Sequence, residues 1–503
     1  MRQVLIANRG EIAVRVARAC KAAGLRTTAV YSEADRTALH VRVADDAVCV
    51  GPPPARESYL DIEKVLAAAK ATGADAIHPG YGFLSENAEF AEAVARAGLT
   101  WIGPPPAAIT AMGSKIGARE KMVAAGVPVV PGEHTAGQDP AALRAAAERV
   151  GYPLLVKASA GGGGKGMRAV HTPAELGPAI EAAQREAKAA FGDASVYLER
   201  LLENPRHIEI QVFGDAHGQV VHLGERECSI QRRHQKVVEE APSVALDPAL
   251  RARMGEAAIA AARAVDYVGA GTIELMLDDR TGDFYFLEMN TRLQVEHPVT
   301  ELAYGVDLVD AQLRVAQGQK LPWPQERLVP RGWAIEVRLY AEDPAKGFLP
   351  STGALRRFRP PVGPGIRLDS GYVEGDEVPV HYDPMLAKLI AWGEDREHAR
   401  GRLAAALDAW EIHGVTTNLP FLAAVVRHPA FASGALSTGF IGEHFPDGLA
   451  APEPSREALI ALALADALGV GKAGAGGGGG AAGPDPAAPW HAVGAWRGAG
   501  GPR

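Results

Sequence analysis

Short apolar runs alternate with amphipathic helical patterns over residues 1–112. The apolar runs cover 4–7, 28–31 and 76–78, and the helical patterns cover 12–23, 62–71 and 88–97. Strands separated by single helices favour a parallel sheet with helices on both faces, the doubly wound α/β arrangement. Ligands of such sheets bind beyond the carboxyl ends of the strands. The segment 78–87 lies at such an end, although a Gly/Pro turn before a helix accounts for it equally well.

Between 113 and 322 the pattern changes to pairs of strands joined by turns. The pairs are 154–158 with 167–170, 207–213 with 220–223, and 272–277 with 284–289. This is an α+β pattern and predicts a second domain. Residues 332–446 carry strand patterns at 334–340 and 386–392 and an amphipathic helix at 397–410. They predict a third domain that can fold around its own core.

Residues 447–503 have a different character. The stretch 455–468 predicts an apolar helix, and 471–489 holds five consecutive glycines, which predicts a flexible linker. Trp490 and Trp496 follow the linker. A short Trp-bearing stub at this place suggests a missing further domain or a segment that docks on a partner, and we favour the missing domain.

The composition is ordinary for a soluble protein of about three domains, with 503 residues, 47% of them hydrophobic and 22% charged. The net charge of -8 argues against general nucleic-acid binding. Cys20, Cys49 and Cys228 form no CxxC pair, so neither a disulfide framework nor a zinc cluster is supported. The sequence shows no apolar signal core and no run of about 18 apolar residues, which predicts a cytoplasmic protein without a membrane span.

Residues 288–298 (EMNTRLQVEHP) place acid, amide, guanidinium, amide and acid at every second position. On an extended chain these side chains begin on one face. They are Glu288, Asn290, Arg292, Gln294 and Glu296. A solvated edge strand can look similar, but the preceding FYFL run is too apolar for an exposed edge, so we expect buried carboxylates with metal ions or cationic partners. A straight strand would hold Glu296 roughly 26 Å from Glu288, so the chain must bend after Asn290 if both serve one reaction centre.

The predicted hairpin of 272–277 with 284–289 brings a second acid to this segment. If Leu277 pairs with Asp283, Glu274 and Glu288 become near diagonal neighbours, and Asn290 lies one step beyond. Two carboxylates and an amide oxygen suit Mg²⁺. The alternative is a pair of like-charged surface glutamates, which would repel each other without any gain.

The glycine-rich run 161–166 (GGGGKG) is a candidate phosphate loop. It formally satisfies GxGxxG, but a strand pattern follows it, so the Rossmann context is absent, and the Walker A signature fails because Met167 follows the last glycine. Backbone N–H groups of a glycine loop at a hairpin tip can approach phosphate oxygens closely. Lys157 at the end of the preceding strand favours this interpretation over an unstructured turn.

Three other patterns hold candidate residues, each with a plain structural alternative. In 207–212 polar and apolar residues alternate, which puts His207 on a polar face but also describes an ordinary half-buried strand. The run 231–236 (QRRHQK) is dense in hydrogen-bond donors, like many solvated basic loops. Strand alternation would bury Arg338, which implies an anionic partner, and Glu336 on the same face is the structural candidate.

With these residues assembled, the chain resembles biotin carboxylase, the ATP-grasp component of biotin-dependent carboxylases, from Val4 to about Phe445. The stretches that carry the resemblance are IANRGEIA (6–13), HPGYGFLSEN (78–87), KASAGGGGKGMR (157–168), ENPRHIEIQV (203–212), ECSIQRRHQKVVEEAP (227–242) and EMNTRLQVEHPVTE (288–301). The resemblance implies ATP-dependent carboxylation of biotin by bicarbonate through carboxyphosphate. It implies a biotin-carboxylase N-terminal domain (1–112), an ATP-grasp domain (113–322) with a mobile lid at about 131–204, and a C-terminal domain (332–446), followed by the helix, linker and stub of 447–503.

The same resemblance implies roles for individual residues. Lys115, Lys157 and the loop glycines Gly162, Gly163 and Gly164 would hold the ATP phosphates, and Glu199, His207, Gln231 and His234 would contact the nucleotide. Glu274, Glu288 and Asn290 would hold Mg²⁺ or Mn²⁺. Lys236 and Arg292 would bind bicarbonate, Glu296 would deprotonate it, and Arg338 would stabilise the biotin enolate.

Departures from the family pattern affect the adenine contacts and the biotin. Arg200 stands where relatives often carry Lys, and Phe440 stands where some have His. The sequence has no Ala-Met-Lys-Met biotinylation segment, since Lys121-Met122 follows Glu120 inside a predicted helix. We therefore expect the biotin on a separate carrier protein or on a carrier domain after Arg503. A carboxyltransferase subunit would select acetyl-, propionyl- or methylcrotonyl-CoA, and relatives commonly form homodimers.

Two other functions compete with this interpretation. A different ATP-grasp ligase, such as one that makes carbamoyl phosphate, would be expected to have duplicated halves, and the sequence shows no internal repeat. A nucleotide-binding scaffold that organises carboxylase subunits would have no need of Glu296, Arg292 and Arg338.

Overall fold

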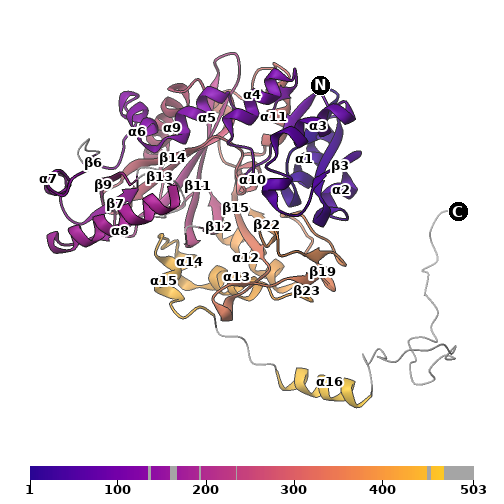
Figure 1. Ribbon diagram of the computed structural model, residues 1–503. Coiled ribbons are helices and arrows are strands. Elements are labelled where there is room, and N and C mark those ends of the chain that lie inside the picture. The colour runs from indigo at the N-terminus through magenta and orange to yellow at the C-terminus, as the bar shows by residue number, and fades with distance from the viewer. Residues whose placement is uncertain (134–137, 159–166, 192–193, 234, 450–454, 469–503) are drawn as a thin grey trace, which may run out of the picture. The chain divides into compact units, whose positions relative to one another are not determined.

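The computed structural model describes residues 1–133, 138–158, 167–191, 194–233, 235–449 and 455–468 (Figure 1). The chain divides into two compact units, Met1–Ala450 and Ala451–Arg503. All of the candidate site residues named above belong to the first unit.

The first unit begins with a five-stranded parallel sheet in the order β3-β2-β1-β4-β5. Its elements are β1 (Gln3–Ile6), α1 (Gly10–Ala22), β2 (Arg26–Ser32), β3 (Asp46–Gly51), α3 (Ile62–Thr72), β4 (Ala76–His78), α4 (Ala88–Arg96) and β5 (Thr100–Trp101). Leu5 packs in one core with residues of α3 and α4, whereas Val4 packs in another core with residues of α1. The doubly wound arrangement is therefore confirmed. The sequence prediction omitted β3 and β5, because β3 is half exposed and β5 has two residues.

An eight-stranded sheet follows, in the order β14-β13-β10-β11-β12-β15-β22-β20, with antiparallel neighbours. Its strands are β10 (Arg206–Gly214), β11 (Val220–Arg232), β12 (Gln235–Ala241), β13 (Gly269–Asp278), β14 (Asp283–Asn290), β15 (Trp333–Tyr340), β20 (Ile366–Ser370) and β22 (Met385–Gly393). Ile208 and Ile273 pack on one face with Met254 of α9 (Pro248–Arg263). Glu209 and Glu274, directly opposite each other on β10 and β13, are buried next to these apolar positions, on the other face. This polar face holds the candidate site.

The region 332–446 continues this sheet and packs around an apolar core that is distinct from those described above. Pairing of Val238 on β12 with Val337 on β15 joins it to the preceding strands. Its apolar core includes Ile230 and Val238, packed with helices α12 (Arg396–Asp408) and α13 (Leu419–Arg427). This core is formed mainly by the region itself, and β11 and β12 contribute to it through the pairing of β12 with β15.

A smaller four-stranded sheet lies in the order β6-β9-β7-β8 and carries two helices (Figure 1). Its elements are β6 (Gly132–Glu133), α7 (Pro140–Val150), β7 (Leu154–Ala158), β8 (Arg168–Val170), α8 (Pro173–Phe191) and β9 (Val196–Arg200). It has an apolar core of its own that runs from Leu143 to Leu198. The predicted hairpin of 154–158 with 167–170 is confirmed. The glycine loop between these strands, with Gly162, Gly163 and Gly164, lies outside the described residues.

In the second unit the predicted helix of 455–468 is present as α16 (Arg456–Ala467). Leu459, Leu462 and Leu464 on it are exposed. The predicted linker and stub, 471–503, lie outside the described residues. Within the part of the chain that the structure describes, no helix combines the length and the apolar character that a membrane crossing requires.

Candidate active site

Glu274 on β13 and Glu288 on β14 lie directly opposite each other. The predicted pairing of Leu277 with Asp283 is wrong, because Leu277 pairs with Phe284. An irregularity in the ladder immediately after Glu274 then adds one residue to β14 and aligns the two acids. The acids are thus direct cross-strand partners and not the diagonal neighbours that the sequence predicted.

β14 is the edge strand of its sheet, although its FYFL run predicts a covered strand. A preceding segment covers the edge: the Phe286 N–H donates to the Pro128 carbonyl at 2.7 Å, and Val129 bridges to Phe286. This cover explains the apolar sequence of an edge strand. The side chain of Glu288 is nonetheless exposed, whereas Glu274 is buried, so the expected burial of the carboxylates is correct for Glu274 and wrong for Glu288.

The oxygen atoms around Glu274 could serve as ligands of a divalent cation. The Asn290 amide nitrogen donates to Glu274 Oε1 at 2.9 Å, and its oxygen accepts from Arg292 at 2.8 Å. Burial alone would raise the pKa of Glu274, but the positive charge of Lys236 outweighs it and holds this pKa well below its usual value. An ionised carboxylate facing Glu288, with an amide oxygen close by, is a ligand set that Mg²⁺ prefers.

The chain leaves the sheet after Asn290, as predicted. β14 ends there, and Glu296 is the N-cap residue of α10 (His297–Tyr304). The bend brings Glu296 back to Glu274, because the ammonium of Lys236 on β12 contacts both. It donates to Glu209 at 2.5 Å, to Glu274 at 2.9 Å and to Glu296 at 2.7 Å. The alternative that 231–236 is a solvated loop is wrong for Lys236, which lies in a strand among buried acids.

Arg338 on β15 approaches Glu296 on its other carboxylate oxygen. Its guanidinium donates to Glu239 at 2.6 Å and to Glu296 Oε2 at 3.0 Å, and it is buried as predicted. Glu336, the structural partner that the sequence offered, makes no hydrogen bond through either carboxylate oxygen within the described residues. Burial raises the pKa of Glu336 well above its usual value.

Glu296 is held as a carboxylate between cations. Burial would raise its pKa, but Lys236, Arg338 and Arg226 outweigh burial and hold the pKa of Glu296 well below its usual value. The cations act strongly on the pKa of Glu296 because its side chain is 2% exposed, and opposite charges are weakly screened where water is excluded. A buried, ionised carboxylate with a cation on each oxygen is therefore the central group of the site.

Arg226 on β11 holds several side chains of this site in place through hydrogen bonds, and this role was not predicted from the sequence. Its guanidinium is fully buried and donates to five acceptors. These are Glu209 at 2.5 Å, Gln211 at 2.6 Å, Gln294 at 2.7 Å, and Thr272 and Thr300 at 3.0 Å. The alternation of 207–212 indicates this polar face of β10. Arg226, the cation on β11 that matches it, can be identified only when the register between the two strands is known.

We expect Arg226→Met to lower the free energy of unfolding by about 3–5 kcal/mol, because it leaves buried acceptors without their cation. Urea unfolding followed by circular dichroism would measure the change. Arg357→Met is the matched control, since Arg357 forms an exposed pair with Glu411 and its loss should cost about 1 kcal/mol or less. Equal losses in the two variants would contradict the supporting role of Arg226.

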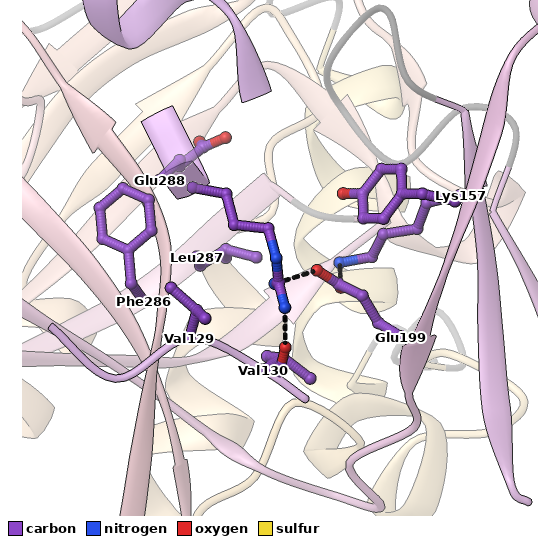
Figure 2. A pocket seen from close by; sticks show the side chains of 9 residues that line it. Val129, Val130, Lys157, Glu199, Phe286, Leu287 and Glu288 are labelled. Carbon is purple, nitrogen blue, oxygen red and sulfur yellow. Dashed lines mark hydrogen bonds and ion pairs between the residues drawn. The ribbon is translucent and has the colours of Figure 1, made fainter. Parts of the chain in front are cut away.

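A pocket opens between β14 and the four-stranded sheet, and Figure 2 shows its lining. Glu199 on β9 accepts from Lys157 Nζ at 2.5 Å and from Arg119 at 3.1 Å, and Arg119 also donates to the Val130 carbonyl at 2.5 Å. Val129, Tyr197, Phe286 and Leu287 supply the remaining wall, together with Glu288. The pocket therefore joins an apolar wall, two cations and the candidate metal ligand Glu288.

The other predicted nucleotide residues are distributed unevenly. His207 lies 3.2 Å from Glu274, and Gln231 lies 3.4 Å from His207. Neither His207 nor Gln231 is among the residues that line the pocket. Lys115 begins α6 (Lys115–Ala124), but its side chain and the whole of His234 lie outside the described parts. Arg292 donates to Glu86 at 2.8 Å, which ties it to the loop 78–87.

Arg119 in the pocket was missed by sequence reasoning. Its position one helical turn after Lys115 on α6 is the only available signal. For the nucleotide site that the resemblance implies, we expect Arg119→Met to raise the KM for ATP about tenfold, because a charge-assisted hydrogen bond to Glu199 is lost. Initial rates at varied ATP concentration would test this. Arg96→Met, which removes an exposed helix pair with Glu92, should leave the KM for ATP unchanged.

Three family models match the chain in succession. They are "Biotin carboxylase, N-terminal domain" over 1–109, "Carbamoyl-phosphate synthase L chain, ATP binding domain" over 114–323, and "Biotin carboxylase C-terminal domain" over 336–443. The biotin carboxylase of Halalkalibacterium halodurans is 53% identical over 443 residues, which cover 88% of this chain and 98% of that protein. The chain belongs to the biotin carboxylase family. It is an ATP-grasp ligase, and its reaction is ATP-dependent carboxylation of biotin by bicarbonate.

Solved structures of biotin carboxylases have the same fold. The Campylobacter jejuni biotin carboxylase-beta-gamma-ATP complex matches with a TM-score of 0.84 and 46% identity, covering 88% of this chain and 99% of that one. The biotin carboxylase domain dimer of Hydrogenobacter thermophilus 2-oxoglutarate carboxylase, in complex with MgADP, ADP and bicarbonate, also matches with a TM-score of 0.84 and 46% identity, covering 90% and 99%. The mitochondrial methylcrotonoyl-CoA carboxylase subunit alpha of Oryza sativa subsp. japonica is 53% identical over 446 residues, 88% of this chain. This biotin carboxylase spans 60% of the length of that relative.

Proposed function

We propose that Glu296 is the general base that removes the proton of bicarbonate. The observation that supports this role is the position of the ionised Glu296 between Lys236 at 2.7 Å and Arg338 at 3.0 Å. Bicarbonate becomes an effective nucleophile only when it loses its proton, so a carboxylate beside it accelerates the attack on ATP. Attack on the γ-phosphorus forms carboxyphosphate and releases ADP.

Different cations around Glu296 are assigned to the two anionic species, bicarbonate and the biotin enolate. We assign Lys236 and Arg292 to bicarbonate, since an ammonium and a guanidinium fork provide charge-assisted donors for its oxygens. Carboxyphosphate breaks into carbon dioxide and phosphate, and this phosphate takes the ureido N–H proton of biotin. Arg338 stabilises the oxyanion of the resulting biotin enolate, whose nitrogen attacks the carbon dioxide. Its fixed bond to Glu239 preorganises the guanidinium for that charge.

The nucleotide is assigned to the adjoining pocket. Lys115, Lys157, Gly162, Gly163 and Gly164 hold its phosphates, and Glu199, His207, Gln231 and His234 contact the rest of it. Lys157 has to leave Glu199 for this purpose, and Arg119 then remains as the partner of that carboxylate. Glu274, Glu288 and Asn290 hold Mg²⁺, which supplies neutralising charge for the phosphoryl transfer when bound. A lid formed by about 131–204 closes over the carboxyphosphate and excludes water.

We further propose that the biotin reaches this site on a carrier protein or carrier domain, because the printed sequence has no Ala-Met-Lys-Met segment. The names of the relatives favour a methylcrotonoyl- or propionyl-CoA carboxylase with a carboxyltransferase subunit as partner. A homodimer is proposed from the dimeric relative. A cytoplasmic location is also a proposal, since several relatives are named as mitochondrial.

A phosphate-release assay on the purified chain tests the proposed function. We expect ATP hydrolysis only when Mg²⁺ and bicarbonate are both present, and we expect free biotin to raise the rate. Chelation of Mg²⁺ by EDTA should abolish turnover, and excess Mg²⁺ should restore it. Turnover that does not respond to biotin would argue for another ATP-grasp ligase reaction.

A further inference from the structure

Lys388 on β22 is a fully buried lysine with no place in the roles assigned so far. It lies directly opposite Arg338 in the sheet, and its side chain is 0% exposed. Its ammonium lies 3.2 Å from Glu11 and 3.7 Å from Asp369.

The third contact reaches the active site. The Lys388 ammonium donates to the main-chain carbonyl of Val295 at 2.6 Å, the shortest of its contacts. Val295 lies in the turn between β14 and α10, which carries Arg292 and Glu296. A short charge-assisted bond to a carbonyl one residue before Glu296 fixes the backbone from which that carboxylate projects.

Glu11 extends this contact to a second loop. It lies in the first turn of α1 and accepts a hydrogen bond from the Tyr81 hydroxyl, in the loop 78–87 that follows β4. The same loop provides Glu86, which accepts from Arg292. One ammonium thus joins the Glu296 turn to the candidate ligand loop.

We propose that Lys388 is a positioning residue of the carboxylation site, which sets the place of Glu296 by holding the Val295 carbonyl. The proposal rests on the proposed role of Glu296 as general base. It separates Lys388 from the nucleotide pocket, because within the described residues Lys157, Glu199 and Arg119 share none of its hydrogen bonds. Loss of the ammonium should therefore impair turnover and spare ATP binding.

The test compares Lys388→Met with Leu389→Ala in the bicarbonate- and biotin-dependent ATPase assay. We expect Lys388→Met to lower kcat about 30-fold with the KM for ATP within about twofold, since misplacement of a reacting group by about 1 Å costs up to 100-fold in rate. Leu389 is the next residue of β22, is buried and packs in the apolar core of this region. Its truncation lowers the Tm, and we expect its kcat to stay within about threefold of wild type.

An equal loss of kcat in both variants, or a parallel rise in the KM for ATP, would overturn the proposal and leave Lys388 a purely structural residue. If Lys388→Met does not fold, Glu11→Gln decides, because it keeps an acceptor for Tyr81 and removes the carboxyl group that faces the ammonium. We expect about fivefold lower kcat at unchanged KM for ATP; wild-type kcat in Glu11→Gln would overturn the proposal. Wild-type turnover in the same assay tests the proposed function separately, since inactive wild-type enzyme would refute the reaction and not the positioning.

Discussion

Glu296→Gln is expected to lower bicarbonate-dependent phosphate release by about 10²- to 10⁴-fold, the contribution of a positioned general base. Glutamine keeps the size of the side chain, but its single amide oxygen can accept from only one of the two cations, and it cannot take the proton of bicarbonate. Steady-state kcat with saturating ATP, bicarbonate and biotin measures the effect. The KM for ATP should change little, because Glu296 is not part of the pocket lining.

Glu397→Gln is the control for this variant. Glu397 is exposed on α12 and pairs only with Arg400 among its charged contacts in the described structure. Its turnover should equal that of wild type. Full bicarbonate-dependent turnover in Glu296→Gln would remove the general-base assignment and favour a nucleotide-binding scaffold.

Arg338→Gln is expected to abolish most of the stimulation by biotin, with a fall of about 10²- to 10³-fold in the biotin-dependent rate. The guanidinium is the only assigned stabiliser of the enolate oxygen, and its replacement also leaves Glu239 without its hydrogen-bond donor. Phosphate release without biotin should fall far less, because Lys236 and Arg292 still bind bicarbonate. Rates with and without free biotin separate the two effects.

The paired control for Arg338 is Arg357→Gln, which removes an exposed guanidinium that contacts Glu411. It should keep the full response to biotin. If Arg338→Gln lowered the rates with and without free biotin by the same factor, Arg338 would serve bicarbonate activation or the fold. The assignment of Arg338 to the enolate would then be wrong.

The hairpin and the bend of the acidic segment could be predicted because both depend on local sequence. Period-two alternation placed Glu274 and Glu288 on the polar face, and the distance limit of an extended strand required the bend after Asn290. The register failed by one residue at Leu277, because the hydrophobic pattern does not fix the length of the turn. It failed by a second residue between Leu275 and Glu274, where the folded sheet has a ladder irregularity.

Contacts between distant segments could not be predicted in the same way. Strand alternation predicted that Arg338 and Glu336 are buried on one face. The partner of Arg338 is nevertheless Glu239, whose position depends on how β12 pairs with β15. The contribution of Ile230 and Val238 to the core of 332–446 has the same origin. The family resemblance supplied positions for Lys157 and Glu199 but not their bond to each other, nor Arg119 beside them.

The two cations on Glu296 also hold its affinity for a proton low. When bicarbonate draws Lys236 toward itself, the field that suppresses this basicity weakens. The proton affinity of Glu296 then grows only as bicarbonate arrives, before any biotin enolate exists. Such a dependence would keep the carboxylate from taking a proton from solvent while the substrate that it serves is absent.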